Sequence, residues 1–156
     1  MTKKLYRPGV GIMLINANRH IFMGRRIGVA VGGWQMPQGG IDEQEDIRSA
    51  ALRELYEEAG INKVDILEIS KRWFSYELPL SMAVDPWRGK YVGQRQKWFA
   101  MAYTGRDSEI NLDASGHPEF DAWEWMPPAR CLQEIISFKK SLYESVFAEF
   151  DCWLIP

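Results

Sequence analysis

Three glutamates are spaced so that a helix would place them on one face. Glu54, Glu57 and Glu58 stand at i, i+3 and i+4, positions that are neighbours on a helix surface. Like charges at this spacing repel one another and destabilise an isolated helix, whereas a cation bound by all three would turn that repulsion into affinity. Oxygen ligands favour hard cations such as Mg²⁺ or Mn²⁺, which take further ligands from water and substrate phosphates. The spacing therefore indicates a divalent-cation site and phosphate chemistry.

The residues around these glutamates predict the helix that would carry them, from about residue 46 to residue 59. Apolar positions at helical spacing form a second stripe, which can be buried while the carboxylates stay accessible. The stripe consists of Leu52, Leu55 and Ala59. Gly60 follows, at the place where a glycine commonly ends a helix. Arg53 stands four residues before Glu57, so we expect it to orient that carboxylate.

A run of acidic residues is usually a solvated surface, and residues 42–58 could be no more than that. The run, however, lies inside a longer pattern in which glycines, glutamates and an arginine recur at fixed spacing. The positions that define it are Gly39, Glu45, Arg53, Glu54, Leu55, Glu57, Glu58, Gly60 and Ile61. Residues 39–61 resemble the signature of the Nudix hydrolases at each of these positions. The resemblance implies one Nudix domain over residues 1–156 that hydrolyses a nucleoside diphosphate linked to another group, using Mg²⁺, Mn²⁺ or another divalent cation.

Charge is unevenly distributed along the chain, although the formal net charge is only −2. Residues 41–60 carry seven acidic residues against two arginines, a net charge of −5. Residues 71–100 carry six basic residues against two acidic ones, a net charge of +4. An acidic cation site beside a basic surface suits a polyanionic substrate. Ordinary solvated charge remains the alternative for any single one of these basic residues.

Length and composition exclude several classes of protein. A chain of 156 residues, 46% of them hydrophobic, can bury the core of one domain. The two cysteines, Cys131 and Cys152, show no metal-ligand spacing, which predicts free thiols in a reducing compartment. No apolar run approaches the length of a membrane span, and no secretory signal is recognisable. We therefore expect a cytoplasmic protein that binds neither membranes nor DNA.

Hydrophobic periodicity predicts more strands than helices. The strand-forming segments are residues 6–15, 20–25, 63–76, 96–103 and 120–126. Apolar residues return to helical spacing from about residue 129 to residue 152, after two prolines have ended the last strand. Many strands with few, late helices indicate an α/β fold with a mixed sheet between helices. The resemblance implies the same arrangement, the α/β/α sandwich of the Nudix fold.

Five segments outside the signature resemble one group within that family, the bacterial RNA pyrophosphohydrolases. They are YRPGVG at 6–11, WQMPQGG at 34–40, GQRQKWF at 93–99, PEFDAWEW at 118–125 and SFKKSLYESVFAEF at 137–150. The group's reaction would convert 5′-triphosphorylated RNA to 5′-monophosphorylated RNA. Close relatives hydrolyse dinucleoside oligophosphates such as diadenosine tetraphosphate, which is the alternative activity. A non-catalytic nucleotide-binding regulator is a third hypothesis, and the intact glutamate set argues against it.

The resemblance also assigns roles at the cation site. The implied ligands are four carboxylates and one backbone carbonyl: Gly39, Glu54, Glu57, Glu58 and Glu119. Glu119 follows Pro118 on a predicted loop, where an exposed acid without a role is the alternative. The implied catalytic residues are Glu54, Glu58 and Arg53. Either of the two glutamates could accept the proton of the attacking water.

Substrate contacts are expected from aromatic and basic side chains. The candidates are Arg26, Tyr76, Lys97, Phe138 and Lys139. An aromatic ring followed by lysines can stack on a base while the lysines meet phosphate, as in single-stranded RNA binding. The alternative for Phe138 is a place in the core of the last helix, which periodicity allows equally.

Overall fold

Two long strands run parallel through the centre of the sheet. The computed structural model describes residues 5–29, 31–79 and 91–155, and in it β1 (Tyr6–Ile15) pairs with β7 (Gly93–Tyr103). Their register runs from Tyr6 opposite Gly93 to Ile15 opposite Ala102. This pair forms the axis on which the rest of the fold is arranged, because strands are added on both sides of it.

Six further strands extend this pair into a mixed sheet whose main order is β3-β2-β1-β7-β5. They are β2 (Ile21–Arg26), β3 (Trp34–Gln35), β4 (Gln38–Gly40), β5 (Val64–Ile69), β6 (Phe74–Glu77) and β8 (Phe120–Met126). All of these pairings are antiparallel: β4 lies along β1, β6 along β7, and β8 along β2. Each segment predicted as strand-forming contains a strand, with residues 63–76 divided between β5 and β6, but the short strands β3 and β4 were not predicted.

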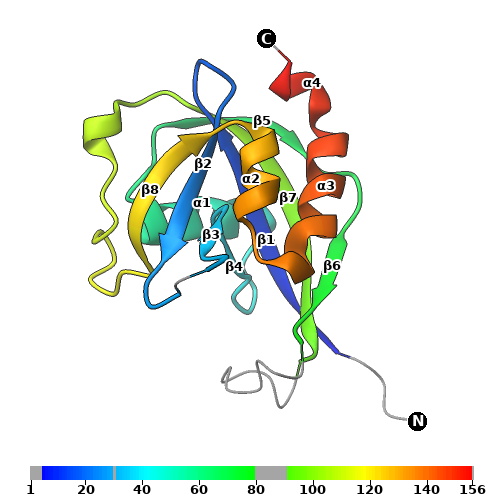
Figure 1. Cartoon of the computed structure of the whole chain (residues 1–156). Helices are drawn as coiled ribbons and strands as arrows, with labels where there is room; N and C mark the ends of the chain where they lie inside the picture. The colour runs from blue at the N-terminus through cyan, green and yellow to red at the C-terminus, as the bar shows by residue number, and fades with distance from the viewer. Residues whose placement is uncertain (1–4, 30, 80–90, 156) are drawn as a thin grey trace.

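Helices cover both faces of the sheet, as Figure 1 shows. The helix α1 (Ile47–Ala59) lies behind the sheet in this view, and the remaining helices lie in front. Those in front are α2 (Pro128–Glu134), α3 (Lys140–Glu149) and α4 (Asp151–Leu154). Two 3-10 turns complete the described elements, η2 (Asp107–Glu109) and η3 (Ser137–Lys139). The predicted α/β/α sandwich with a mixed sheet is therefore confirmed.

The two faces of the sheet belong to two separate hydrophobic cores. Along β1, Val10, Ile12 and Leu14 pack into the core that includes α1. The intervening Met13 and Ile15 pack into the opposite core, which includes α2 and α3. This alternation follows from the two-residue period of a strand. Because β1 is buried on both faces, it is a fixed support for the elements that carry polar side chains.

The helix α1 is capped at both ends by its own sequence. The carboxylate of Asp46 accepts a hydrogen bond from the backbone N–H of Ser49 at 2.7 Å. Gly60 has a φ of 66°, and its N–H donates to the carbonyl of Tyr56 at 2.8 Å. The helix therefore begins and ends within a residue or two of the predicted positions.

The buried stripe of α1 differs from the predicted one in the first half of the helix. Leu55 and Ala59 are buried as predicted, but Leu52 is 40% exposed. Ala50 and Ala51 are buried in its place, against the sheet. The small alanines let the first half of the helix approach the sheet closely, and Leu52 consequently points toward solvent.

The C-terminal helical segment is interrupted where a continuous pattern was predicted. After α2, Ile135 and Ile136 adopt extended backbone conformations, and Ile135 forms a bridge with Gly33. The chain then turns through η3 before α3 begins. This break matters for the site, because it fixes Phe138 and Lys139 in a turn from which Lys139 reaches Gln35 of β3 and Gln38 of β4.

Two predictions about composition can be compared with the structure directly. Cys131 is buried, Cys152 is exposed, and both are free, as predicted. Within the described parts of the chain, no helix has the length and apolar character needed to cross a membrane.

Candidate active site

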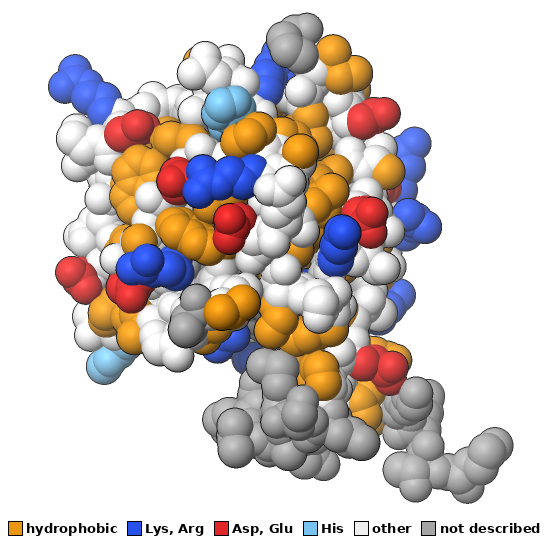
Figure 2. All heavy atoms as spheres, viewed as in Figure 1, with side chains coloured by type: hydrophobic (Ala, Val, Ile, Leu, Met, Phe, Trp, Pro, Cys, Tyr) orange, Lys and Arg blue, Asp and Glu red, His pale blue; other side chains and the backbone are white. Residues whose placement is uncertain are grey.

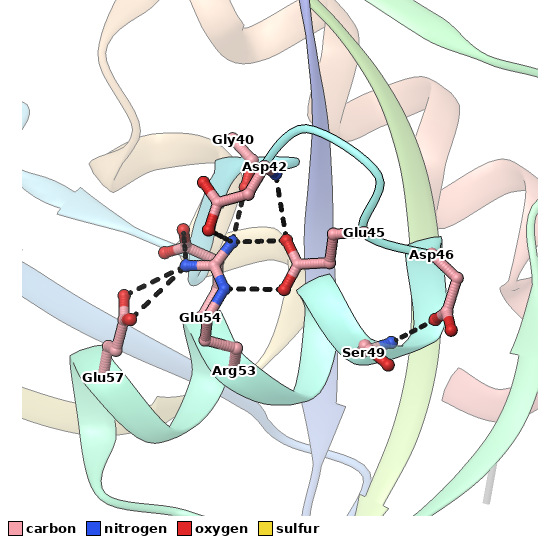
Figure 3. Close-up of polar contacts among 8 residues, drawn as sticks. All are labelled: Gly40, Asp42, Glu45, Asp46, Ser49, Arg53, Glu54 and Glu57. Atoms are coloured by element: carbon pink, nitrogen blue, oxygen red, sulfur yellow. Dashed lines mark hydrogen bonds and ion pairs between the residues drawn. The ribbon is translucent and has the colours of Figure 1, made fainter.

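The guanidinium group of Arg53 is the centre of the polar cluster on α1, as Figure 3 shows. It contacts both oxygens of Glu45 at 2.8 Å, in a bidentate pair. Its Nη1 donates to Glu54 at 2.9 Å and to Glu57 at 3.3 Å, which confirms the predicted contact with Glu57. Its Nη2 also donates to the backbone carbonyl of Gly40 at 2.9 Å. Arg53 therefore fixes two carboxylates of α1 and ties the helix to the loop before it.

The pair between Arg53 and Glu45 stays charged. Its hydrogen bonds raise the pKa of Arg53 above its ordinary value. The same bonds lower the pKa of Glu45 to about 2. Charge-assisted bidentate pairs of this kind are among the stronger hydrogen-bonded contacts in proteins. The motif position Glu45 thus has a physical role, which is to hold the arginine that orients the other glutamates.

Glu58 and Glu54 lie in poorly solvated positions. Glu58 is only 3% exposed, and its Oε2 accepts a hydrogen bond from the backbone N–H of Gln38 at 3.3 Å. Burial raises the pKa of Glu58 well above its ordinary value, and the nearby charges of Glu119 and Glu54 raise it further. Burial likewise raises the pKa of Glu54 to about 7. A cation beside these carboxylates would offset both the lost hydration and the mutual repulsion.

Gly39 is required because the carboxylate of Glu54 lies directly against it. A Cβ atom at this position would overlap the Glu54 carboxylate. Gly39 belongs to β4, where it pairs with Val10 of β1, so its backbone cannot move away easily. The next residue, Gly40, is crowded in the same way by the guanidinium group of Arg7. Because both positions are glycines, the acidic side chain of Glu54 and the basic side chain of Arg7 can lie against adjacent residues of the backbone.

The carboxylates of the cluster are not arranged around one common point. Across residues 5–29, 31–79 and 91–155, no three His, Cys, Asp or Glu side chains are grouped as a metal-binding set. Glu54 and Glu57 instead both accept hydrogen bonds from Arg53. The donor chemistry nevertheless fits a hard divalent cation, because the predicted ligands are all oxygens. Of these, Glu58 is buried and Glu54 partly buried, and both are crowded by like charge.

A first cavity of about 370 Å³ opens beside this cluster. Its lining combines acidic, basic and aromatic side chains. The basic ones are Arg7, Arg26 and Lys139, the aromatic ones are Tyr76 and Phe138, and the acidic ones are Glu54, Glu57 and Glu119. The predicted residues Arg26, Tyr76, Phe138 and Lys139 thus lie around one space with the glutamates, although they come from three distant parts of the sequence.

Lys97, which was predicted to contact the substrate, lies away from the first cavity. It is not among the residues that line the first cavity. Its Nζ donates to the carbonyl of Lys71 at 3.0 Å and lies 5.5 Å from the centre of the Trp73 ring. The reason is the strand period, because Gln94 and Gln96 of β7 face the cavity side and Lys97 faces the other. Arg88 and Lys90, two other basic residues of this segment, lie outside the described residues.

Lys139 lines the cavity but is not a free surface lysine. It is 5% exposed, and its Nζ lies 3.2 Å from Oε1 of Gln38 and 3.4 Å from Oε1 of Gln35. It also lies 4.9 Å from the centre of the Tyr76 ring. Burial lowers the pKa of Lys139 to about 7, and the positive charge of Arg26 contributes. Lys139 is therefore a buried hydrogen-bond donor within the wall of the cavity.

A network of glutamines was missed by sequence reasoning. The side chain of Gln38 accepts from Gln96 at 3.2 Å and donates to the hydroxyl of Tyr76 at 3.2 Å. Its backbone N–H holds Glu58, as described above. Arg7 was missed as well, although its segment was recognised. The signal that could have found it is the pair of glycines at 39–40, since adjacent glycines in a strand indicate close approach by neighbouring groups.

A second cavity, of about 390 Å³, lies on another side of the glutamates. Its lining residues are Glu54, Tyr56, Glu57, Glu58, Ser115, His117 and Glu119. Glu54, Glu57 and Glu119 line both cavities, so they form a shared wall between them. The loop residue Glu119, which the sequence alone left ambiguous, is therefore placed next to the glutamates of α1.

Comparison with known proteins identifies the class. The family model for the NUDIX domain matches residues 5–146, so the chain belongs to the Nudix family. It is a hydrolase of this family, whose members generally use divalent metal cations.

Curated relatives are similar over most of the chain. A protein named RNA pyrophosphohydrolase from Wolbachia sp. subsp. Drosophila simulans is 47% identical over 149 residues, which cover 96% of this chain and 91% of that protein. A protein of the same name from Roseobacter denitrificans is 44% identical over 151 residues, covering 96% and 94%.

Among solved structures, a C. elegans Ap4A hydrolase in a binary complex aligns with a TM-score of 0.67 at 19% identity, covering 94% of this chain and 98% of that one. The MutT protein from Methanosarcina mazei aligns with a TM-score of 0.69 at 17% identity, covering 96% and 99%. These two likenesses concern the fold.

Replacing Gly39 with alanine should displace Glu54 without unfolding the protein. The added methyl group would occupy the space of the Glu54 carboxylate, which is the flexible end of its side chain. We expect kcat to fall roughly tenfold, because a misplaced catalytic group is costly even at small displacements. The free energy of unfolding should change by less than about 1 kcal/mol. Steady-state kinetics measures kcat, and urea unfolding measures the free energy of unfolding. Unchanged kcat would mean that catalysis does not depend on the position of the Glu54 carboxylate against Gly39.

Proposed function

We propose that this protein is a metal-dependent RNA pyrophosphohydrolase that converts 5′-triphosphorylated RNA to 5′-monophosphorylated RNA. The observation that carries the proposal is the first cavity, which joins the glutamate cluster to a basic and aromatic wall. The names of the curated relatives support the same substrate. Two free cysteines fit a cytoplasmic location, where RNA substrates are present.

The basic side chains in the cavity are suited to the phosphates. Figure 2 shows the face that carries α2 and α3, where Lys and Arg side chains are interspersed with Asp, Glu and apolar groups. Positive charge is thus not gathered into one patch on that face, and recognition of an anion has to come from local groups. Arg7 and Arg26 both line the cavity. Planar guanidinium groups bind phosphate oxygens in pairs, so these two side chains orient the triphosphate.

The aromatic side chains are suited to the base. The rings of Tyr76 and Phe138 lie 6.2 Å apart between centroids, tilted by 40°. Both residues line the first cavity, where Tyr76 is buried and Phe138 is partly exposed. Lys139 adds a buried donor at the same wall. A base that stacks against Phe138 is held by dispersion and by hydrogen bonding rather than by surface charge.

The glutamates are suited to the hydrolytic step. Gly39, Glu54, Glu57, Glu58 and Glu119 would hold Mg²⁺ or Mn²⁺. When bound, such a cation neutralises phosphate oxygens and activates water for attack. Glu54 or Glu58 accepts the proton of the water that attacks phosphorus, and Glu54 is the one that lines both cavities. The phosphoric anhydride bond breaks, pyrophosphate leaves, and the RNA keeps a 5′-monophosphate. Of these two glutamates, Arg53 positions Glu54, to which it donates a hydrogen bond.

Hydrolysis of dinucleoside oligophosphates is the second candidate function. The fold likeness to an Ap4A hydrolase and the open space on both sides of the glutamates favour it. The deciding experiment compares kcat/KM for 5′-triphosphorylated RNA and for diadenosine tetraphosphate under identical Mg²⁺. We expect the higher value with RNA, and no turnover of either in excess chelator. Turnover of diadenosine tetraphosphate alone would establish the alternative, and turnover in excess chelator would contradict the role of the cation.

Replacing Phe138 with alanine should weaken RNA binding selectively. Stacking of a base is worth about 1–3 kcal/mol by alanine substitution, so KM for RNA should rise roughly tenfold to a hundredfold. Hydrolysis of a small nucleotide that depends less on stacking should survive better. Phe147 provides the matched control, because it is buried in the same core but does not line the first cavity. The Phe147→Ala variant should melt at lower temperature without substrate selectivity; the same behaviour in Phe138→Ala would assign Phe138 to the core alone.

A further inference from the structure

Basic side chains gather on strands β6 and β7, on the side of the sheet that faces away from the first cavity. Arg95 and Lys97 occupy alternate positions of β7, so both project from the face opposite to Gln94, which lines the first cavity. On this face the core under α1 reaches Phe99, whereas Arg95 is exposed. This half of the face is therefore uncovered, and no role described above uses it.

Trp73 gives this basic surface an aromatic centre. The ring is partly exposed, with Cζ of Arg95 at 4.8 Å and Nζ of Lys97 at 5.5 Å from its centre. Lys97 also donates to the carbonyl of Lys71 at 3.0 Å, which ties β7 to the segment before β6. Cations over a ring are attracted to it, so the two charges and the ring form one unit. We call Trp73, Arg95 and Lys97, with the exposed Lys71 and Arg72 beside them, the outer basic patch.

The positive charges of the outer basic patch are not neutralised by ion pairs. Within the described part of the chain, none of its four basic side chains is paired with a carboxylate. Two carboxylates lie nearby. Glu77, at the end of β6, accepts from the hydroxyl of Tyr6, and Glu149 of α3 accepts from the backbone N–H of Lys71. An excess of positive charge beside an aromatic ring suits a polyanion with unstacked bases, which is single-stranded RNA.

The strand β6 connects the outer basic patch to the first cavity. Tyr76, which lines the cavity, stands three residues after Trp73, or roughly 10 Å along an extended chain. In β7, Gln94 lines the cavity and Arg95 follows immediately on the other face. Among the described strands β6 pairs with β7 alone, so its other side is an edge around which an RNA chain can pass. The patch is therefore within reach of an RNA whose 5′ end occupies the cavity.

We propose that the outer basic patch binds the single-stranded part of the RNA that follows its 5′ end. The inference rests on the proposed function, because it assumes an RNA substrate whose triphosphate is held at the glutamates. It adds a second contact surface, which holds phosphates and unstacked bases without reading their sequence. A substrate too short to reach the patch therefore binds more weakly, although the reaction at the glutamates is the same.

The test measures KM and kcat on two 5′-triphosphorylated RNAs, a dinucleotide and a single strand of roughly 12 nucleotides, within the site sizes of single-strand-binding surfaces. Wild type should have the lower KM for the longer RNA. Arg95→Gln combined with Lys97→Gln should raise that KM roughly tenfold, with kcat and the dinucleotide KM within about twofold of wild type. The slope of log KM against log salt concentration should also fall by about 1.4, at about 0.7 for each lost phosphate contact.

Two further variants complete the comparison. Trp73→Ala should raise KM for the longer RNA roughly tenfold with little change in the salt slope, because stacking carries its part. Its melting temperature shows whether it folds, and the charge variant decides alone if it does not. The matched control removes two positive charges elsewhere, by Lys63→Gln combined with Arg130→Gln, whose side chains are paired with Glu109 and Glu124. This control should keep the wild-type dependence of KM on RNA length.

Binding of the longer RNA with a 5′-hydroxyl end separates this inference from the proposed function, because that RNA has no phosphate group to release. Its Kd, measured by fluorescence anisotropy, should be roughly tenfold weaker in the variant with both Arg95→Gln and Lys97→Gln. A wild-type Kd in this variant, or an unchanged dependence of KM on length, would overturn the inference and leave the patch to an acidic protein partner. The proposed function fails separately, if wild type cleaves neither 5′-triphosphorylated RNA.

Discussion

Replacing Glu58 with glutamine should lower kcat at least about a hundredfold in Mg²⁺, while the protein remains folded. Loss of groups around a bound metal commonly costs ten- to a hundredfold, and Glu58 is placed among the groups that would hold it directly. The substitution is nearly isosteric and keeps an acceptor for the N–H of Gln38. Steady-state kinetics on 5′-triphosphorylated RNA measures the effect. Wild-type turnover in the variant would remove Glu58 from the cation site.

Stability in chelator provides the control for Glu58→Gln. Burial raises the pKa of Glu58 in the folded state above its value in the unfolded chain. The folded state therefore binds this proton more tightly, and the associated stability is present at low pH and is lost as pH rises above the unfolded value. In excess chelator near pH 8, the glutamine variant should be at least as stable as wild type. Its advantage should shrink as the pH is lowered toward 5. A variant less stable than wild type at pH 8 would contradict the crowded, buried state of Glu58.

Replacing Arg53 with lysine should impair both stability and activity. Lysine keeps the charge but cannot reproduce the bidentate contact with Glu45 together with the contacts to Glu54 and Gly40. Hydrogen bonds to charged groups contribute about 1.5–3 kcal/mol each, so losing at least one should lower the free energy of unfolding by about 1–2 kcal/mol. With Glu54 no longer held, kcat should fall on the order of tenfold to a hundredfold.

Arg48 offers a matched control for this substitution. It lies on the same helix, five residues earlier, and is exposed. Arg48→Lys should therefore leave unfolding in urea and kcat close to wild type. If Arg53→Lys and Arg48→Lys gave the same kinetics, the guanidinium cluster would have no part in orienting the glutamates.

The parts of the molecule that follow from local sequence were predictable. The caps and boundaries of α1 follow from Asp46 and Gly60, and β8 was predicted with its observed bounds because its alternating pattern ends at two prolines. The contact between Arg53 and Glu57 follows from helical spacing alone. The family signature placed the glutamates on one helix face. Each of these features depends on residues within a few positions of one another.

The features that depend on long-range contacts were not predictable in the same way. The sequence around Lys139 indicates a residue on the surface. The break before η3 instead places Lys139 in the wall of the first cavity, where it contacts Gln35 and Gln38. Lys97 had the right charge for a phosphate contact. The pairing of β7 with β1, however, fixes which side chains of β7 face the cavity, and Lys97 is not among them. Arg7 became recognisable only through its approach to Gly40. In each case the deciding partner is distant in sequence.

The parallel pairing of β1 with β7 has a consequence for folding during translation. Every paired residue in this register has its partner 87 positions later, from Tyr6 with Gly93 to Ile15 with Ala102. At translation rates of about 5–20 residues per second, each residue of β1 is synthesised roughly 4–17 seconds before its partner in β7. During that interval its other side can already pair with β2 and β4, which follow soon after it in the sequence. The helix α1 is also synthesised before β7. The glutamate cluster can therefore form on a partial sheet in which the edge of β1 that pairs with β7 is still unpaired.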